Sequence, residues 1–295
     1  MTQRQPSMTG RTCLITGASS GIGRATARAL ARLGANLVLV CRDRGRGEDT
    51  VAELRDQPGS QAVNLMLADL SSQASVRALA REFLGSAQPL HVLVNNAGVV
   101  NLKRTLTADG IETVLAVNHL ACFLLTHLLL ERRQASAPAR IVNVASDAHR
   151  WAPMNFDDIE GEHRYRPMRI YGQSKLANVL FTYELARRLD DTRVTVNCVH
   201  PGAVATRLGG NNGAWAKVLI SMLRPLFRTP EAGAATSVYL ASSPEVEGVT
   251  GKYFSDCRVR RSSKDSYDEC AARRLWDISA CLTGIDALST TTGFC

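Results

Sequence analysis

Short apolar runs alternate with longer segments of helical period over most of the chain, from residue 12 to residue 199. Most of these runs are continuous rather than alternating, which is typical of strands that are covered on both faces. The predicted strands are Cys13–Ile15, Leu37–Cys41, Val63–Leu67, Val92–Val94, Ile141–Val144, Val194–Val199 and Lys252–Phe254. Regular alternation of strand and helix predicts an α/β fold built on a doubly wound parallel sheet with right-handed crossovers.

The helical segments and the irregular stretches between them indicate a single domain. The first helix is predicted over Gly21–Leu33, and another over Glu231–Ala241 precedes the last strand. Two irregular stretches, 148–168 and 206–229, follow the carboxyl ends of strands, where doubly wound folds bind ligands. We expect one domain over residues 10–285 with a substrate loop near 206–229, and flexible ends at 1–9 and 286–295.

Length and hydropathy add limits on the class of protein. A single core in a chain of 295 residues buries roughly 75% of the surface that the unfolded chain exposes, so no metal or disulfide is needed for stability. No run approaches the roughly 18 apolar residues of a membrane span, and the opening MTQRQPSMTGR lacks the apolar region of a secretory signal. We expect a cytoplasmic protein, with peripheral contact on an intracellular membrane left open.

The formal net charge of +8 raises the question of a nucleic-acid partner. The densest basic cluster comprises Arg258, Arg260, Arg261 and Lys264; acidic residues are interleaved with it, and no aromatic platform lies near it. We therefore expect no nucleic acid, since a basic surface suits an anionic cofactor or an anionic membrane face better. The eight cysteines form no CxxC pair and no zinc-ligand spacing, which predicts reduced thiols and no metal site.

A glycine-rich loop directly follows the first predicted strand and opens the first predicted helix. Residues 16–23 read TGASSGIG, so the glycines have the spacing G-x-x-x-G-x-G. Glycine permits the tight turn and lets a pyrophosphate approach the backbone, and the helix N-terminus offers free N–H groups. This context favours a Rossmann-type dinucleotide site over an ordinary glycine turn. Its predicted cofactor-binding residues are Gly17, Ser19, Ser20, Gly21, Ile22 and Gly23.

The residues after the second strand bear on the choice between NAD and NADP. An NAD site carries an acidic side chain at this place for the ribose 2′-hydroxyl. This chain has Cys41 and then Arg42, with Arg44 and Arg46 close behind. A guanidinium forms a paired hydrogen-bonding fork on a 2′-phosphate, so the sequence favours NADP with Arg42 as its ligand. The alternative is that Arg42 is a solvated loop charge beside Asp43.

Tyr171 and Lys175 open a predicted helix after the fifth strand. Their spacing of four residues puts both side chains on one helix face. The ordinary pKa of tyrosine, about 10, is too high for efficient proton transfer at neutral pH, and a nearby ammonium lowers it. Tyr-x-x-x-Lys is common on helices by chance, so its place in a dinucleotide fold is what favours a catalytic pair.

With these motifs in this order, the sequence resembles the classical short-chain dehydrogenase/reductase family over roughly residues 10–285. The resemblance implies that Tyr171 is the general acid/base and that Ser146 orients the substrate oxygen by a hydrogen bond. Lys175 would bind the nicotinamide ribose and lower the pKa of Tyr171, and Asn118 would hold a water chain that relays the proton outward. The motifs are Thr16–Gly23, Asp69, the run 95–98 (NNAG), Asn118, Ser146, Tyr171 with Lys175, and Pro201 with Gly202.

The same resemblance implies further contacts with the cofactor. Asp69 and Leu70 would contact the adenine; Asn95, Ala97 and Gly98 would wall the adenine ribose and stabilise the sheet; and Pro201, Gly202 and Thr206 would touch the nicotinamide amide. Structural alternatives stand beside two of these roles: Asp69 is well placed to cap a helix starting near Ser72, and Asn95 is suited to satisfying buried backbone groups. His200 is expected to be a packed or supporting residue and not a catalytic base.

Within the family, the sequence is similar to the retinol dehydrogenase group of broad-specificity retinaldehyde reductases, which typically prefer NADP(H). The strings that carry this similarity are 143–149 (NVASDAH), 174–181 (SKLANVLF), 199–202 (VHPG) and 251–257 (GKYFSDC). The resemblance implies an NADP-dependent oxidoreductase of retinol and lipid metabolism that interconverts retinol and retinaldehyde or similar long apolar alcohols and aldehydes. Members of the family commonly pair through long helices, so a homo-oligomer is compatible with the sequence.

Two alternatives to that function stay open. One is the same chemistry on another substrate, with the protein acting as a carbonyl reductase for a steroid, a lipid-derived aldehyde or a xenobiotic ketone. The other is a non-catalytic nucleotide-binding protein, against which the intact set of Ser146, Tyr171, Lys175 and Asn118 argues.

One segment of the predicted substrate loop has the composition of a membrane-surface helix. Between Trp215 and Arg228 the chain places aromatic and aliphatic residues between Lys217, Arg224 and Arg228. Such a segment suits a helix that lies in the headgroup boundary of a bilayer. The alternative is that these residues only roof the substrate pocket.

Overall fold

The computed structural model describes residues 7–57, 62–190, 192–204 and 228–285. Within these ranges one sheet of eight strands has the order β3-β2-β1-β4-β5-β6-β7-β8, and every neighbouring pair except β7 with β8 is parallel. The chain runs outward from β1 to β3 and then returns to build the other half from β4. This order reverses direction between β1 and β4, as in doubly wound folds, and it confirms the predicted fold class.

All seven predicted strands are present, some of them one or two residues longer than expected. The strands are β1 (Thr12–Thr16), β2 (Asn36–Cys41), β3 (Val63–Leu67), β4 (Val92–Asn95), β5 (Ala139–Val144), β6 (Val194–Val199), β7 (Lys252–Ser255) and β8 (Arg258–Arg260). The short edge strand β8 was not predicted, because its three residues are exposed and form no apolar run. It pairs with β7 through a turn in which Asp256 and Cys257 both have positive φ, where a glycine signal would be usual.

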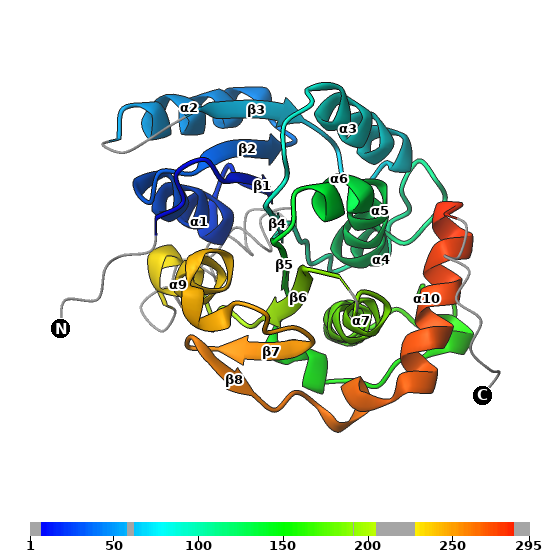
Figure 1. Ribbon diagram of the computed structural model, residues 1–295. Helices are drawn as coiled ribbons and strands as arrows, with labels where there is room; N and C mark the ends of the chain where they lie inside the picture. The colour runs from blue at the N-terminus through cyan, green and yellow to red at the C-terminus, as the bar shows by residue number, and fades with distance from the viewer. Residues whose placement is uncertain (1–6, 58–61, 191, 205–227, 286–295) are drawn as a thin grey trace.

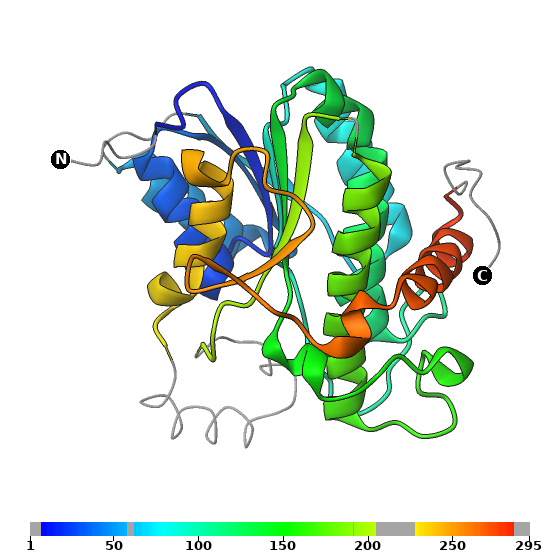
Figure 2. The same ribbon diagram turned by 60° about the horizontal axis from the view of Figure 1, so that its bottom comes forward.

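Helices cover both faces of the sheet (Figures 1 and 2). Helices α1, α2 and α9 lie on one face, and α3, α4, α5 and α7 lie on the other, with α10 outside α7. The α-helices are α1 (Gly21–Arg32), α2 (Arg44–Arg55), α3 (Gln73–Gly85), α4 (Thr113–Leu115), α5 (Ala121–Leu128), α6 (Leu130–Ala135), α7 (Pro167–Arg188), α9 (Pro230–Ser242) and α10 (Glu269–Thr283). A π-helical turn, η1 (Ala116–Leu120), joins α4 to α5; the 3₁₀ turns are η2 (Asp147–Arg150), η3 (Phe156–Asp158), η6 (Pro244–Val246) and η7 (Lys264–Tyr267).

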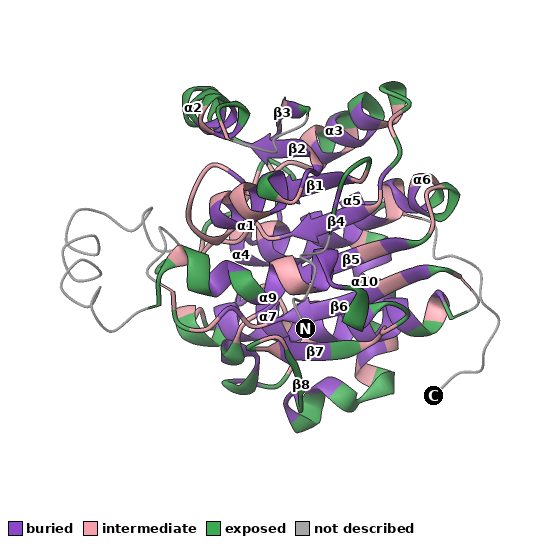
Figure 3. Ribbon diagram, turned by 60° about the vertical axis from the view of Figure 1, so that its left-hand side comes forward, coloured by how far each residue is buried: buried purple, intermediate pink, exposed green. Residues whose placement is uncertain are grey.

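The core lies on both sides of the sheet, as the continuous apolar strands require (Figure 3). Successive strand side chains point to opposite faces, so Ile15 packs with Leu30 of α1 whereas Leu14 packs with Phe83 of α3. Each of these four side chains is completely buried. The sheet is therefore a rigid platform whose strand ends hold loops in fixed positions.

The structure differs from the sequence-based expectation near both ends of the described chain, at Met8 and at helix α10. Met8, expected in a flexible N-terminus, is buried in the core and donates its backbone N–H to Leu33 O at 2.7 Å. Helix α10, for which no helix was predicted, packs against α7 and buries Trp276, whose ring centroid lies 5.2 Å from that of Phe123. In the part of the chain that is described, no helix is long and apolar enough to cross a bilayer.

Candidate active site

The glycine-rich loop folds tightly against the loop after β4. Gly17 has a φ of +67°, and a Cβ built on it would lie 3.1 Å from Ala97 Cα. The Asn96 amide crosses between the loops and donates to Thr16 O at 2.8 Å, while Thr16 Oγ1 accepts the backbone N–H of Asn96 at 3.0 Å. A Cβ on Gly23 would lie only 2.4 Å from Gly17 O. Glycine is therefore required at residues 17 and 23 by the close packing of backbone against backbone.

Helix α1 starts from this loop with its N-terminus free for a ligand. Ser20 is the N-cap residue in an extended conformation, and within the described chain no side chain caps the first turn. The first backbone N–H groups of a helix lack partners inside the helix and attract anions. Ser19, Ser20, Gly21 and Ile22 are half-buried around this turn, so they fit the cradle for a pyrophosphate that the sequence predicted.

Arg42 follows β2 beside this loop and differs from the two arginines after it. Arg44 pairs with Glu48 at 3.5 Å, and Arg46 pairs with Asp43, the N-cap residue of α2, at 3.4 Å. The exposed Arg42 side chain makes no hydrogen bond or ion pair with the described residues. Its guanidinium is therefore the one in this loop that is available to an external anion.

Asp69 and Leu70 follow the third strand, β3, which ends at Leu67. Asp69 is exposed, and its Oδ1 accepts hydrogen bonds from Ser71 N at 3.0 Å and Ser71 Oγ at 2.8 Å. The N-cap residue of α3 is Ser72, which accepts from Ser75 N. The alternative role of Asp69 as the helix cap is thus wrong, because Asp69 forms the turn that precedes the cap.

Asn95 faces the interior instead of the cofactor edge. It is 6% exposed, and its amide donates to Thr126 Oγ1 at 3.1 Å and to Asn143 Oδ1 at 2.9 Å. Asn143 in turn donates to Thr182 Oγ1 at 2.9 Å. These bonds join β4, β5, α5 and α7 beneath the site. The Asn95 side chain therefore holds the sheet together, and Ala97 and Gly98 are the half-buried residues that border the predicted cofactor edge.

Tyr171, Ser146 and Lys175 come together at the carboxyl ends of β5 and β6. Tyr171 and Lys175 lie in the first turns of α7, and the Lys175 Nζ atom is 5.7 Å from the centroid of the Tyr171 ring. Ser146 follows β5, and its hydroxyl lies near enough to the Tyr171 phenol to influence the pKa of that group. Lys175 is 3% exposed and donates to Val144 O at 3.1 Å. The structure thus brings together the three groups that the sequence predicted.

The protonation of this pair differs from the expectation. Burial raises the pKa of Tyr171 to about 12, and the nearby Ser146 hydroxyl acts in the opposite direction. Burial lowers the pKa of Lys175 to about 8. The expected lowering of the Tyr171 pKa by Lys175 is not found: removal of the phenol from water dominates, and the Lys175 ammonium is bonded to Val144 O. At neutral pH the phenol keeps its proton and is poised as a donor.

Asn118 joins the site through the π-helical turn η1. Its Oδ1 accepts from Val99 N at 2.7 Å, and its Nδ2 donates to Val99 O at 3.0 Å and to Ser174 Oγ at 2.9 Å. A Cβ on Gly98 would lie 3.3 Å from Asn118 Oδ1 and 3.4 Å from Lys175 Nζ. Both side chains therefore converge on Gly98. No role was predicted for Ser174 from the sequence, although its position next to Lys175 in the predicted helix was a signal that could have identified it.

The loop after β6 is described only in part. His200 Nδ1 accepts from Asp147 N at 3.1 Å, which agrees with a supporting role. Gly202 has a φ of +82°, and Arg228, which pairs with Asp256 at 2.5 Å, lies against it. Thr206 and nearly all of the predicted substrate loop and membrane segment lie outside the described residues.

Apolar side chains are exposed beside the predicted catalytic residues. Trp151 is 59% exposed, and its ring centroid lies 6.4 Å from that of Tyr171. Met168, which is 49% exposed, stands in the first turn of α7 three residues before Tyr171. Exposed apolar side chains next to a catalytic group provide contact area for an apolar substrate.

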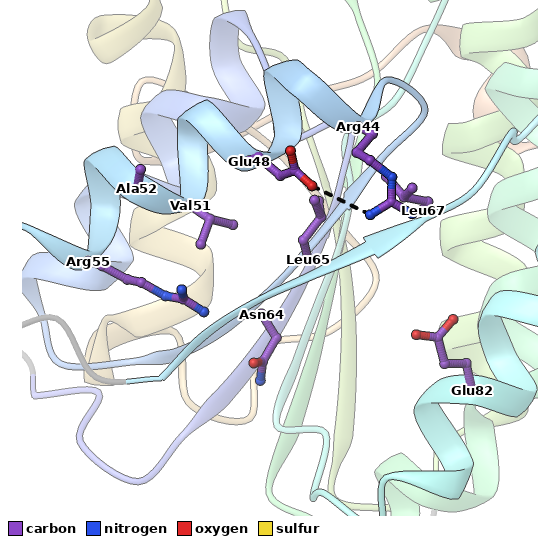
Figure 4. A pocket seen from close by; sticks show the side chains of 9 residues that line it. All are labelled: Arg44, Glu48, Val51, Ala52, Arg55, Asn64, Leu65, Leu67 and Glu82. Atoms are coloured by element: carbon purple, nitrogen blue, oxygen red, sulfur yellow. Dashed lines mark hydrogen bonds and ion pairs between the residues drawn. The ribbon is translucent and has the colours of Figure 1, made fainter.

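A groove lies away from these residues, at the edge of the sheet formed by β3 (Figure 4). This groove of about 560 Å³ lies between α2, β3 and α3, and it is lined by Arg44, Glu48, Val51, Ala52, Arg55, Asn64, Leu65, Leu67 and Glu82. It contains none of the predicted catalytic residues. Among the described residues, no group of three or more His, Cys, Asp or Glu side chains is placed to hold a metal ion.

Comparisons with known proteins agree with this geometry. The sequence model of the short chain dehydrogenase family matches residues 11–217. Retinol dehydrogenase 14 from Homo sapiens is 47% identical, covering 94% of this chain and 88% of that protein, and retinol dehydrogenase 12 from Mus musculus is 45% identical, covering 94% and 87%.

Solved structures also share the fold. An uncharacterized protein from Mycobacterium Paratuberculosis has a TM-score of 0.77 at 33% identity, covering 95% of this chain and 96% of that one. The Pseudomonas aeruginosa RhlG/NADP active-site complex has a TM-score of 0.67 at 28% identity, covering 88% and 98%.

Proposed function

Since the chain belongs to the short-chain dehydrogenase/reductase family, we propose that it is an NADP-dependent oxidoreductase that interconverts retinol and retinaldehyde or similar long apolar alcohols and aldehydes. The observation that carries this proposal is the convergence of Tyr171, Ser146 and Lys175 beside an exposed apolar surface. The curated names of its relatives, retinol dehydrogenases 14 and 12, support the substrate class.

The residues around the loops after β1 and β4 fit a nicotinamide dinucleotide. The pyrophosphate would lie on the first turn of α1, against Gly17 and Gly23, where a larger side chain would collide with backbone. Lys175, beside Gly98, would hold the nicotinamide ribose. When bound, the nicotinamide supplies the hydride for reduction of the carbonyl carbon and accepts it in the reverse direction.

Proton transfer falls to the side chains of the protein. The Ser146 hydroxyl binds the substrate oxygen next to the Tyr171 phenol and orients it. As the carbonyl carbon is reduced, Tyr171 gives its proton to that oxygen; in alcohol oxidation it takes the proton back. The raised pKa of Tyr171 suits the first of these directions, because the phenol is protonated at neutral pH. Asn118, bonded to Ser174 near Lys175, would lead the replacement proton in from solvent.

NADP is favoured over NAD by the environment of Arg42. The neighbouring Arg44 and Arg46 have carboxylate partners, whereas Arg42 has none in the described chain. A guanidinium at the end of β2 without a hydrogen bond or ion pair to the described residues suits a 2′-phosphate, whereas the carboxylate that follows it, Asp43, caps α2 and pairs with Arg46.

The test is turnover by the purified protein with NADPH or NADH. The panel comprises all-trans-retinaldehyde, a short aldehyde, a steroid ketone and a lipid-derived unsaturated aldehyde. We expect the highest kcat/KM with retinaldehyde and NADPH. Tyr171→Phe, which keeps the ring and removes the proton, should lower kcat at least roughly 100-fold while NADPH still binds. Preference for the steroid ketone or the lipid-derived aldehyde would redirect the substrate assignment, and more than a tenth of the wild-type kcat in Tyr171→Phe would refute the catalytic one.

A further inference from the structure

His119 directly follows Asn118 in the π-helical turn, but the two side chains lie in different surroundings. Asn118 bonds Val99 and Ser174 at the active site. The His119 side chain is completely buried, and its ring lies 6.3 Å from that of Phe123 and 6.1 Å from that of Phe181. A polar side chain at such a place needs partners, because an unmet buried hydrogen-bonding group is costly.

The contacts of the ring come from two other helices. The His119 Nε2 atom lies 2.8 Å from Ser279 Oγ of α10. The Ser279 hydroxyl donates its own hydrogen to Leu275 O at 2.7 Å, so the imidazole is the donor in the bond to Ser279. The other ring nitrogen, Nδ1, has no hydrogen-bond partner in the described chain, and the ring packs edge-on against Phe181 of α7. One imidazole therefore links the π turn, α7 and α10.

The position of these links matters for the catalytic residues. Phe181 stands six residues after Lys175 on α7, and His119 stands next to Asn118 on the π turn. The contact of His119 with Phe181, together with its bond to Ser279, thus holds the turn that carries Asn118 relative to the helix that carries Lys175. Because burial lowers the pKa of His119 to about 4, the ring stays neutral at neutral pH and makes these contacts without bringing a charge into the core.

A π turn also needs outside support to persist. It holds one residue more per turn than an α-helix, and such turns occur mostly as local bulges at functional sites. Each residue of an α-helix turns by about 100°, so relaxation of η1 to regular helix would rotate Asn118 away from Val99 and Ser174. The links from His119 resist that rotation.

We propose that His119 is a positioning residue, bonded to Ser279 and packed against Phe181, which keeps Asn118 in register with Lys175. This inference rests on the proposed function, in which Asn118 serves proton transfer. It gives α10 a part in catalysis although that helix lies beyond the family match at residues 11–217.

The test compares two buried hydroxyl groups on α10. Ser279→Ala removes the partner of His119. Thr283→Val is the matched control, because Thr283 is 1% exposed and its hydroxyl bonds carbonyls of its own helix, Ser279 O at 2.6 Å and Ala280 O at 3.4 Å. Ser279→Thr retains the hydroxyl group and serves as the rescue variant.

The readouts are kcat and KM with the best aldehyde of the panel, NADPH affinity, and amide hydrogen exchange over residues 113–121. For Ser279→Ala we expect kcat to fall at least tenfold, KM and NADPH affinity to stay within twofold, and exchange over 113–121 to speed up. Thr283→Val should leave all of these unchanged, and Ser279→Thr should restore kcat.

Two results would overturn the inference: a kcat for Ser279→Ala within twofold of wild type, or equal losses in Ser279→Ala and Thr283→Val. If the wild type turns over no member of the panel, the proposed function fails. The hydrogen-exchange measurement then tests the positioning role of His119 separately. Unchanged protection over 113–121 in Ser279→Ala would overturn that role as well.

Discussion

Gly23→Ala adds a single methyl group at the tightest contact of the glycine-rich loop. The added Cβ would lie 2.4 Å from Gly17 O and 2.5 Å from Asn96 Nδ2. Ordinary van der Waals contact for a Cβ begins near 3.4 Å. Helix α1 must therefore move away from the loop by about 1 Å, because backbone on the other side cannot swing aside.

The expected losses follow from that displacement. Overpacking of this kind costs roughly 1–3 kcal/mol of folding free energy. A shift of about 1 Å also moves the first N–H groups of α1 off a bound pyrophosphate, and each lost charge-assisted hydrogen bond weakens binding by about 1.5–3 kcal/mol. We expect NADPH affinity to fall at least tenfold, since about 1.4 kcal/mol corresponds to a factor of ten.

Fluorescence titration with NADPH and urea unfolding measure the two effects separately. Gly85→Ala on α3 is the matched control, because a Cβ there meets nothing within 4 Å and the φ angle is ordinary. That variant should bind NADPH as the wild type does and be at least as stable. If Gly23→Ala binds NADPH within twofold of wild type at unchanged stability, the steric argument for the loop is wrong.

Arg42→Ala is expected to weaken NADPH binding roughly 10- to 150-fold and to spare NADH, because a charge-assisted bond to the 2′-phosphate is lost; equal losses in titrations with the two cofactors would contradict this. Trp151→Ser should raise KM for a long apolar aldehyde about tenfold, with kcat and the KM of a short aldehyde nearly unchanged, since apolar contact area beside Tyr171 is lost; a similar rise for both aldehydes would argue against apolar contact. The buried His119 is neutral in the folded chain and takes up a proton only on unfolding, so this ring should lower the free energy of unfolding by about 2 kcal/mol between pH 6.5 and pH 5. Urea unfolding of the wild type and of His119→Phe at both pH values checks this: the fall should be smaller by about 2 kcal/mol in the variant, while His127, whose pKa burial also lowers to about 4, contributes equally in both proteins. An equal fall in the two proteins would be inconsistent with a neutral buried ring at residue 119.

Local sequence was sufficient for the parts of the fold that repeat a simple pattern. A strand that is buried on both faces is apolar at most positions, so a largely apolar run such as Val194–Val199 predicts a strand. The structure confirms that strand as β6. The glycine spacing around Gly17 and Gly23 reflected close packing of backbone, which a sequence shows directly. Tyr171 and Lys175 were found because one helix face carries both.

The features that were missed depend on contacts between distant segments. The edge strand β8 exists only because Asp256 and Cys257 accept positive φ angles beside β7. The inward direction of Asn95 depends on Asn143, 48 residues away. No sequence pattern indicated the π turn at residues 116–120. The proposed role of His119 depends on Ser279, which is 160 residues away in the sequence.

The packing of α10 has a consequence for synthesis of the chain on the ribosome. Trp276 completes an aromatic cluster with Phe123 and Phe181, whose ring centroids lie 5.2 and 5.9 Å from it. Until residues 269–283 emerge, the faces of α5 and α7 that they cover stand open to solvent. A nascent chain that already contains all the proposed catalytic side chains is therefore still incomplete, and it presents an apolar surface on which chaperones act or aggregation begins.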